Sequence, residues 1–441
     1  MAKVMNFSCL KVARFFMKFF LVAFPFQIRA LVFNMNFFPT GNFNEYASFF
    51  IYLGDLLLLF ACFFYGLAIL RGETKKEFSF GSWQITVALL AFAATMLLSV
   101  FFAEYWQVAL LQFLRFVLLL LLYFLLINDL LERKEVLRFF LYGLLAQSLI
   151  AFGQYIFQGS LGLRFLGEPI LSSDLPGVAK IDFAGMKLVR AYGTFPHPNV
   201  FGGILVAGIF WLYYLYRKNL HLLGTIGVIL LMALLFTFSR SAFLALGGGL
   251  LVLFSLHEGK IRWKYLLLFG CVALFLIVLF NLEGVLIQRV FLGDDPKSAL
   301  ERLEYITAGK KMFFEHPFGV GMGNFTLIMQ NYLGVKLSPW LLQPVHNVYM
   351  LMSNEAGFLG VTALLVLLGV TFFRLLKASR SGDEDERIFT AVSITILLIL
   401  ALISLFDHYL LTLYGGQVFF VIYLALVSAS LNKSLLPRRK S

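Results

Sequence analysis

The chain has 441 residues, of which 60% are hydrophobic and only 14% are charged. A soluble domain of this length needs a more polar surface, so the composition excludes an ordinary water-soluble protein. The net charge of +12 would suggest a nucleic-acid partner in a soluble protein, but in a membrane protein the positions of the basic residues matter more than their sum. The three cysteines, Cys9, Cys62 and Cys271, have no metal-like spacing and indicate no disulfide framework.

Long apolar runs predict an all-α polytopic integral membrane protein with about 12 transmembrane helices, because each crossing takes about 20 apolar residues. In chain order the predicted spans are 19–35, 50–70, 83–102, 108–128, 137–157, 199–216, 222–238, 241–256, 265–282, 347–373, 388–406 and 414–431. Arg29 weakens the first span. The basic N-terminal segment resembles a signal peptide, but it lacks a clear small-residue cleavage site, so we interpret it as part of a retained first helix.

The connections between these spans predict the sidedness of the chain. Lys and Arg gather in every second connection, and this set holds about twice as many basic residues as the opposite set. Short basic connections mark the cytoplasmic side, so we expect both termini inside. The predicted organisation is helices one to five in 1–157, a periplasmic loop at 158–198, helices six to nine in 199–282, a large periplasmic loop at 283–346 and helices ten to twelve in 347–441.

The large loop 283–346 has its own structural signals. Ser298 and Glu301 have the spacing of a capping box, which predicts the start of a helix. His316 is followed by Pro317, a pair that is expected to end that helix. The segment 319–323 alternates glycine with apolar residues and predicts a flexible turn. The loop is therefore expected to contain short helices.

Polar residues away from the cytoplasmic side gather at the end of the first long loop, at a tight turn between two apolar segments, and in the large loop. The basic residues in these places are Arg190, Arg240, Arg289 and Arg302. Arginine on this side runs against the positive-inside bias, and its planar fork of donors suits phosphate oxygens. These arginines could hold a diphosphate, or they could be snorkelling residues or members of loop salt bridges.

His346 lies where the chain re-enters the membrane after the large loop. An imidazole there could take a proton from an attacking hydroxyl, or it could be a hydrogen-bonded interfacial histidine. Asp55 and Glu355 fall inside predicted spans. Either could pair with an outer-face arginine, and pairing between helices is the favoured interpretation.

Several familiar motifs are absent from the sequence. There is no Walker-type phosphate loop and no H-E-x-x-H pattern. No Asp-x-Asp occurs in an outer connection, because Asp294 and Asp295 are adjacent and precede Pro296. We therefore expect neither a metal nor a cofactor, and arginines would have to supply the positive charge.

Several stretches together resemble the bacterial O-antigen ligase and O-antigen polymerase superfamily of membrane glycosyltransferases. The matching segments are 190–199, 237–241, 302–305, 316–325, 346–349 and 355–360. The resemblance rests on their order and spacing around the large outer loop, and it covers about residues 185–365. Tyr305 stands where many relatives have tryptophan, but it keeps an aromatic ring. The first 150 residues match only in helix count.

The resemblance implies a GT-C-like membrane enzyme of the bacterial inner membrane with its active site in the loop 283–346, facing the periplasm. It would move a glycan from an undecaprenyl-diphosphate carrier to an acceptor hydroxyl, with inversion and without metal or cofactor. By match to the family motifs, Arg190, Arg302 and Arg240 would bind the donor diphosphate, and His346 would orient or deprotonate the acceptor hydroxyl. Possible supporting residues are Arg289, Asn347, Thr194, Asn199 and Tyr305.

The expected partners are the lipid-linked glycan donor, lipid A–core or another glycan acceptor, and the bilayer, without nucleic acid. An O-antigen ligase is the leading interpretation, and a polymerase that joins lipid-linked repeat units is close behind. A protein hydroxyl as acceptor is a variant of the same chemistry. A polysaccharide or lipid-linked glycan transporter is the rival, weakly supported by Asp55, Arg115 and Glu355 inside spans. A purely structural role would not explain the arginines on the outer side.

Overall fold

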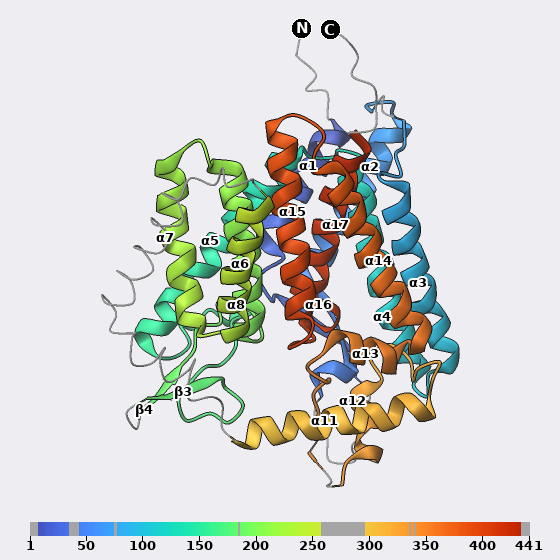
Figure 1. Ribbon diagram of the computed structural model, residues 1–441, viewed down its shortest axis with the longest axis vertical. Coiled ribbons are helices and arrows are strands. Elements are labelled where there is room, and N and C mark those ends of the chain that lie inside the picture. Colours follow the sequence, from blue (N-terminus) through green and yellow to red (C-terminus); the bar gives the residue numbers. More distant parts are fainter. Residues whose placement is uncertain are drawn as a thin grey trace, which may run out of the picture.

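The computed structural model of the protein describes residues 8–34, 44–74, 77–183, 186–256, 296–334, 337–338 and 341–433. Most of these residues are helical, and the described strands form two short antiparallel hairpins. Figure 1 shows the long helices side by side in a bundle, with one helix, α11, lying across its lower end. The fold is thus a helical bundle with a distinct structure over one end.

The helices that run along the bundle are α1 (Cys9–Ala23), α2 (Leu53–Leu70), α3 (Trp83–Phe102), α4 (Trp106–Ile127), α5 (Arg133–Phe157), α6 (Pro198–Tyr216), α7 (Leu220–Thr237), α8 (Arg240–Leu256), α14 (Gly357–Ala378), α15 (Glu384–Ile403) and α17 (Tyr414–Lys433). The shorter elements are β1 (Arg29–Asn34), β2 (Ser48–Tyr52), β3 (Lys180–Phe183), β4 (Met186–Val189), α11 (Pro296–Glu315), α12 (Phe325–Ile328), α13 (Val348–Glu355) and α16 (Tyr409–Thr412).

Nine of the described helices are long and apolar enough to cross a membrane, namely α2 to α7, α14, α15 and α17. α8 is also apolar but has only 17 residues. These helices confirm an all-α polytopic membrane protein. The predicted span 265–282 lies outside the described residues, and the total of twelve spans stays a prediction.

The centre of the bundle is formed by α6 and α17, which are buried over most of their length, whereas only 33% of the α2 span and 28% of the α14 span are buried. Aromatic side chains fill the middle. The Trp211 ring lies 4.9 Å from that of Phe140 on α5 and 5.2 Å from that of Phe419 on α17, centroid to centroid. Tight packing of this kind makes the bundle a rigid support for the loops at its ends.

The first predicted span, 19–35, is wrong in position. α1 covers Cys9–Ala23 instead, and the chain then turns at Pro25 into strand β1, which pairs antiparallel with β2. Proline cannot donate a helical hydrogen bond, and this favours a helix end there. The N-terminus of α1 is held by Glu73, whose carboxylate accepts hydrogen bonds from Ser8 and from the backbone of Cys9 and Leu10.

The predicted span 347–373 is also wrong, because it is broken into α13 and α14 at Ala356. Gly357 has φ +67°, and a Cβ on it would lie 2.4 Å from the carbonyl carbon of Phe318. Gly319, with φ +89°, approaches the backbone of Glu355 in the same way. Only glycine combines such a φ with such close approach. The glycine turn 319–323, predicted to be flexible, is therefore packed into the helix break.

The helix predicted to begin near Ser298 is confirmed as α11, which ends at Glu315, before Pro317. Tyr305 and Met312 of α11 are buried in a small apolar cluster with Phe325 and Leu351. α11, α12, α13 and the β3–β4 hairpin all lie at the lower end of Figure 1. Both long loops therefore cover the same end of the bundle.

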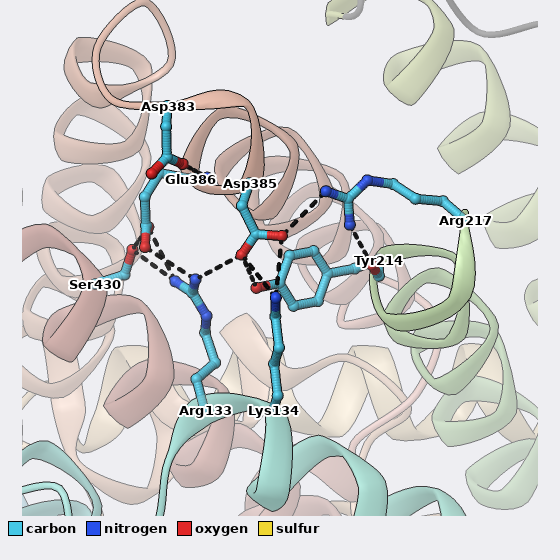
Figure 2. Close-up of polar contacts among 8 residues, drawn as sticks. All are labelled: Arg133, Lys134, Tyr214, Arg217, Asp383, Asp385, Glu386 and Ser430. Atoms are coloured by element: carbon cyan, nitrogen blue, oxygen red, sulfur yellow. Dashed lines mark hydrogen bonds and ion pairs between the residues drawn. The ribbon is translucent and has the colours of Figure 1, made fainter. Parts of the chain in front are cut away.

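The opposite end of the bundle is joined by ion pairs and hydrogen bonds between α5, α6, α15 and α17 (Figure 2). The cluster consists of Arg133, Lys134, Tyr214, Arg217, Asp383, Asp385, Glu386 and Ser430. Arg133 donates two hydrogen bonds of 2.9 Å to the Glu386 carboxylate. Asp385 accepts from Arg217 at 3.0 Å and from the Tyr214 hydroxyl at 2.8 Å. These bidentate and shared contacts fix the helix ends away from the long loops.

Candidate functional site

Three histidines and one aspartate come together at the loop end of the bundle. His346 precedes α13, His408 lies between α15 and α16, and the two rings pack edge to face with centroids 5.1 Å apart. Asp407 is the chain neighbour of His408, and His197 caps the N-terminus of α6. We call His197, His346, Asp407 and His408 the histidine cluster. It gathers residues that are more than 200 positions apart in the sequence.

The histidines of this cluster are held neutral. Burial lowers the pKa of His346; the Asp407 carboxylate opposes this shift and the Arg302 charge adds to it. Burial, reinforced by Arg190, lowers the pKa of His197 to about 3. Burial beside His346 lowers the pKa of His408 to about 3. Burial raises the pKa of Asp407, but the surrounding polar groups, including the backbone N–H of His408 that donates to its carboxylate at 2.8 Å, leave that pKa below its ordinary value. At neutral pH each imidazole is therefore uncharged and keeps one unprotonated ring nitrogen.

His346 itself is mostly buried, and its Nδ1 atom has no hydrogen-bond partner among the described residues. A buried polar atom without a partner is costly unless something else satisfies it. A substrate hydroxyl is one group that would do so. The ring is thus both positioned by its neighbours and free to act at one nitrogen.

Arg190 is tied to the histidine cluster through a chain of hydrogen bonds. It is only 4% exposed, and its Nε donates to the Thr237 carbonyl at 2.6 Å. Its Nη2 donates to Asn199 Oδ1 at 2.7 Å, and the Asn199 amide donates to Asp407 at 3.3 Å. Asn199, predicted as a supporting residue, therefore joins the arginine to the carboxylate.

Arg240 begins α8, directly after the turn that Arg190 contacts through Thr237. Phe238 in this turn has φ +46°, a conformation that is uncommon for a bulky side chain. Ser239 and Ser241 flank Arg240, and their hydroxyls lie 3.2 Å apart. Backbone strain of this kind often accompanies functional sites. Arg190 and Arg240 thus belong to one corner of the molecule, which we call the arginine corner.

Arg302 reaches the site from α11. Its charge is close enough to lower the pKa of His346, and its Nε is buried without a hydrogen-bond partner among the described residues. The structure therefore brings the predicted Arg302 and His346 together, although 43 residues separate them in the chain. Arg289 lies outside the described residues.

The remaining predicted supporting residues make hydrogen bonds within the protein that support the fold. The Asn347 side chain caps α13 by accepting from Met350 N–H and donates to the Leu405 carbonyl at 3.2 Å. Thr194 is buried against α5, where its N–H and hydroxyl both donate to Gln147. The Tyr305 hydroxyl donates to the Leu341 carbonyl at 2.9 Å. Asn347 alone of these three adjoins the histidine cluster in sequence.

Sequence reasoning missed Asp407, His408 and Tyr46. The Tyr46 ring packs edge to face on His408, with centroids 5.5 Å apart, and so brings the first 150 residues to the site. One signal was present: Asp407 and His408 are adjacent polar residues in a short and otherwise apolar connection. Within the described ranges, no group of three or more His, Cys, Asp or Glu side chains is arranged to hold a metal ion.

These features define a polytopic membrane protein with a buried cluster of histidines and arginines under its long loops. Residues 225–365 match the model of the family described as O-antigen ligase, and this match supports membership of the O-antigen ligase superfamily. The matched region contains Arg240, Arg302 and His346, whereas Arg190 precedes it. The family indicates a membrane enzyme of glycan transfer, of the ligase or polymerase type. No curated protein matches the chain.

Proposed function

We propose that the protein transfers a glycan from undecaprenyl diphosphate to an acceptor hydroxyl, and that the acceptor is lipid A–core. The observation that carries this proposal is the mostly buried His346, which has one unpartnered ring nitrogen and a pKa that burial and the Arg302 charge lower. A neutral imidazole beside a guanidinium suits a reaction that removes a proton and leaves an anion.

In the proposed reaction the acceptor oxygen attacks the anomeric carbon as the bond from that carbon to the diphosphate oxygen breaks. His346 takes the hydroxyl proton and later passes it to water. The electron pair of the broken bond stays on the leaving undecaprenyl diphosphate, whose charge Arg302 and the arginine corner stabilise. An in-line displacement inverts the anomeric configuration, and arginines take the place of a metal.

For the whole chain we propose twelve spans, both termini in the cytoplasm, and the histidine cluster facing the periplasm of the bacterial inner membrane. The basic residues of Figure 2 contact the start of α15, whereas Asp407 and His408 follow its other end, and this supports the orientation by the positive-inside rule. Residues 283–346 would then form the periplasmic loop that supplies Arg302 and His346.

The transporter alternative loses its main support. The carboxylate of Asp55 on α2 pairs with the guanidinium of Arg115 on α4, so these in-span charges neutralise each other. A buried pair of this kind holds helices together rather than forming a free ion path. Glu355 lies at the end of α13, outside the candidate spans.

The test of the proposed function is transfer by the purified protein in lipid nanodiscs, given a lipid-linked O-unit donor and lipid A–core. We expect lipid A–core capped with O-units and no chain growth on the lipid carrier. Growth on the carrier without capping would identify a polymerase. Neither product in the presence of folded protein would reject glycan transfer.

The pH profile of this reaction follows from the His346 environment. Because neutral imidazole is the base and its pKa is lowered, activity should persist to a lower pH than for an ordinary histidine of pKa 6.5. Arg302→Gln removes a charge that lowers the pKa, so the acid limb should move to higher pH. Asp407→Asn removes a charge that raises the pKa of His346, so the acid limb should move to lower pH. Profiles of kcat/KM against pH measure both shifts. If the acid limbs of the natural protein and the two variants coincide, His346 is not the base.

A further inference from the structure

A pocket lies beside the histidine cluster, and it is formed by both the N-terminal and the C-terminal parts of the chain. The space within its outline is about 700 Å³, and this figure includes open solvent. Its lining includes Arg29, Glu45, Tyr46, Tyr52, Gln112, Arg115, Thr326, Glu355, Tyr414 and Gln417.

The pocket joins the histidine cluster at three lining residues. Tyr46 contacts the His408 ring, and the Thr412 hydroxyl lies 2.7 Å from His408 Nδ1. Pro344 lies two residues before His346 in the chain. The arginine corner, in contrast, reaches the cluster through Asn199 and Asp407. The pocket and the arginine corner therefore contact the cluster through different residues.

The charges that line this pocket are unsuited to a diphosphate. The guanidinium of Arg29 donates to Glu45 at 2.5 Å, and that of Arg115 pairs with Asp55. Glu355 adds a buried carboxyl group to the wall. Guanidinium groups already paired with carboxylates have little to offer a dianionic ligand. The pocket favours a ligand without strong negative charge.

The same lining suits a hydroxyl-rich ring. Tyr52 and Tyr414 stack with ring centroids 4.0 Å apart, and both contribute aromatic surface to the pocket. Gln112 and Gln417 offer amides. The Thr326 hydroxyl is buried and has no hydrogen-bond partner within the described part of the chain. Aromatic faces with a few polar groups recognise the apolar faces and the hydroxyls of sugars together.

We propose that this pocket binds the saccharide of the acceptor and presents its hydroxyl to His346. This inference rests on the proposed function. It places the acceptor in the pocket and the diphosphate at the arginine corner. The histidine cluster contacts both. An in-line displacement requires that separation. It also gives the first 150 residues a role in choosing the acceptor.

The test is equilibrium binding of a soluble probe to the full-length protein in nanodiscs. The probe is core oligosaccharide released from lipid A by mild acid. Thr326→Val and Gln112→Ala should each weaken binding by about tenfold, the value of roughly one hydrogen bond. Gln107→Ala, the same change on the same helix outside the lining, should leave binding unchanged. Melting temperatures close to that of the natural protein would show that the variants are folded.

Transfer kinetics on the same proteins separate the two proposals. We expect Thr326→Val and Gln112→Ala to raise KM for lipid A–core with KM for the lipid-linked donor unchanged. A rise in the donor KM instead would overturn the inference and assign the pocket to the donor glycan. Absent probe binding, or equal binding in all variants, would also overturn it while leaving His346-dependent transfer intact. Variant-sensitive probe binding without transfer by any preparation would reject the proposed function and leave saccharide binding standing.

Discussion

We expect that replacing His346 with alanine removes glycan transfer while the protein still inserts and folds. The side chain makes an aromatic contact with His408, and its Nδ1 has no hydrogen-bond partner among the described residues, so few stabilising contacts are lost. Removing a general base typically costs roughly 100-fold to 10,000-fold in rate. We therefore expect at least about a 100-fold fall in kcat, measured as capped lipid A–core formed by purified protein in nanodiscs.

The matched control is His316→Ala. His316 is the histidine that follows α11, in the same long loop, but its side chain is exposed and lies outside the histidine cluster. That variant should keep nearly full activity. A second comparison is His346→Gln, which keeps a polar side chain of similar reach but cannot act as a base near neutral pH. Transfer by His346→Gln at the natural rate would mean that His346 orients the acceptor without taking its proton.

The sequence was sufficient to predict the site residues whose type is unusual on the outer side of a membrane protein. Arg302 and His346 could be singled out because a base or an imidazole is unusual where the chain meets the outer side of the membrane. Asp407 and His408 were passed over because their connection is short and apolar, and nothing in one sequence places it beside His346. Their closeness is a product of how α13 packs against the end of α15, where Val348 N–H donates to the Ser404 carbonyl.

The predicted span 347–373 was wrong for a related reason. A hydropathy window counts apolar side chains, and residues 347–373 are apolar enough to be a single span. It cannot register that the backbone of Pro317 and Phe318 packs at Gly357 and interrupts the helix there. That break holds the glycine turn against Glu355, because Gly321 N–H donates to the Glu355 carbonyl at 2.8 Å. The interruption therefore contributes directly to the wall of the pocket beside the site.

Arg190→Lys and Arg302→Lys should each lose activity although the positive charge is kept. Lysine is a point charge without the planar fork that holds two phosphate oxygens, so stabilisation of the leaving diphosphate falls. The loss of one such donor group typically costs roughly 100-fold in kcat or more. We expect the fall in kcat/KM for the lipid-linked donor, with KM for lipid A–core unchanged. Arg164→Lys, an exposed arginine in the first long loop, is the matched control and should retain activity.

The two arginines should differ in a second measurement. Arg190 also supports the fold, since it donates to the Thr237 carbonyl and to Asn199, and its replacement should lower the melting temperature as well as the rate. Arg302 has a buried Nε without a partner in the described chain, so Arg302→Lys should lose rate with little change in stability. Full activity in both lysine variants would rule out bidentate phosphate binding. A loss confined to Arg190→Lys that tracks its melting temperature would reduce that residue to a structural support and leave Arg302 unassigned.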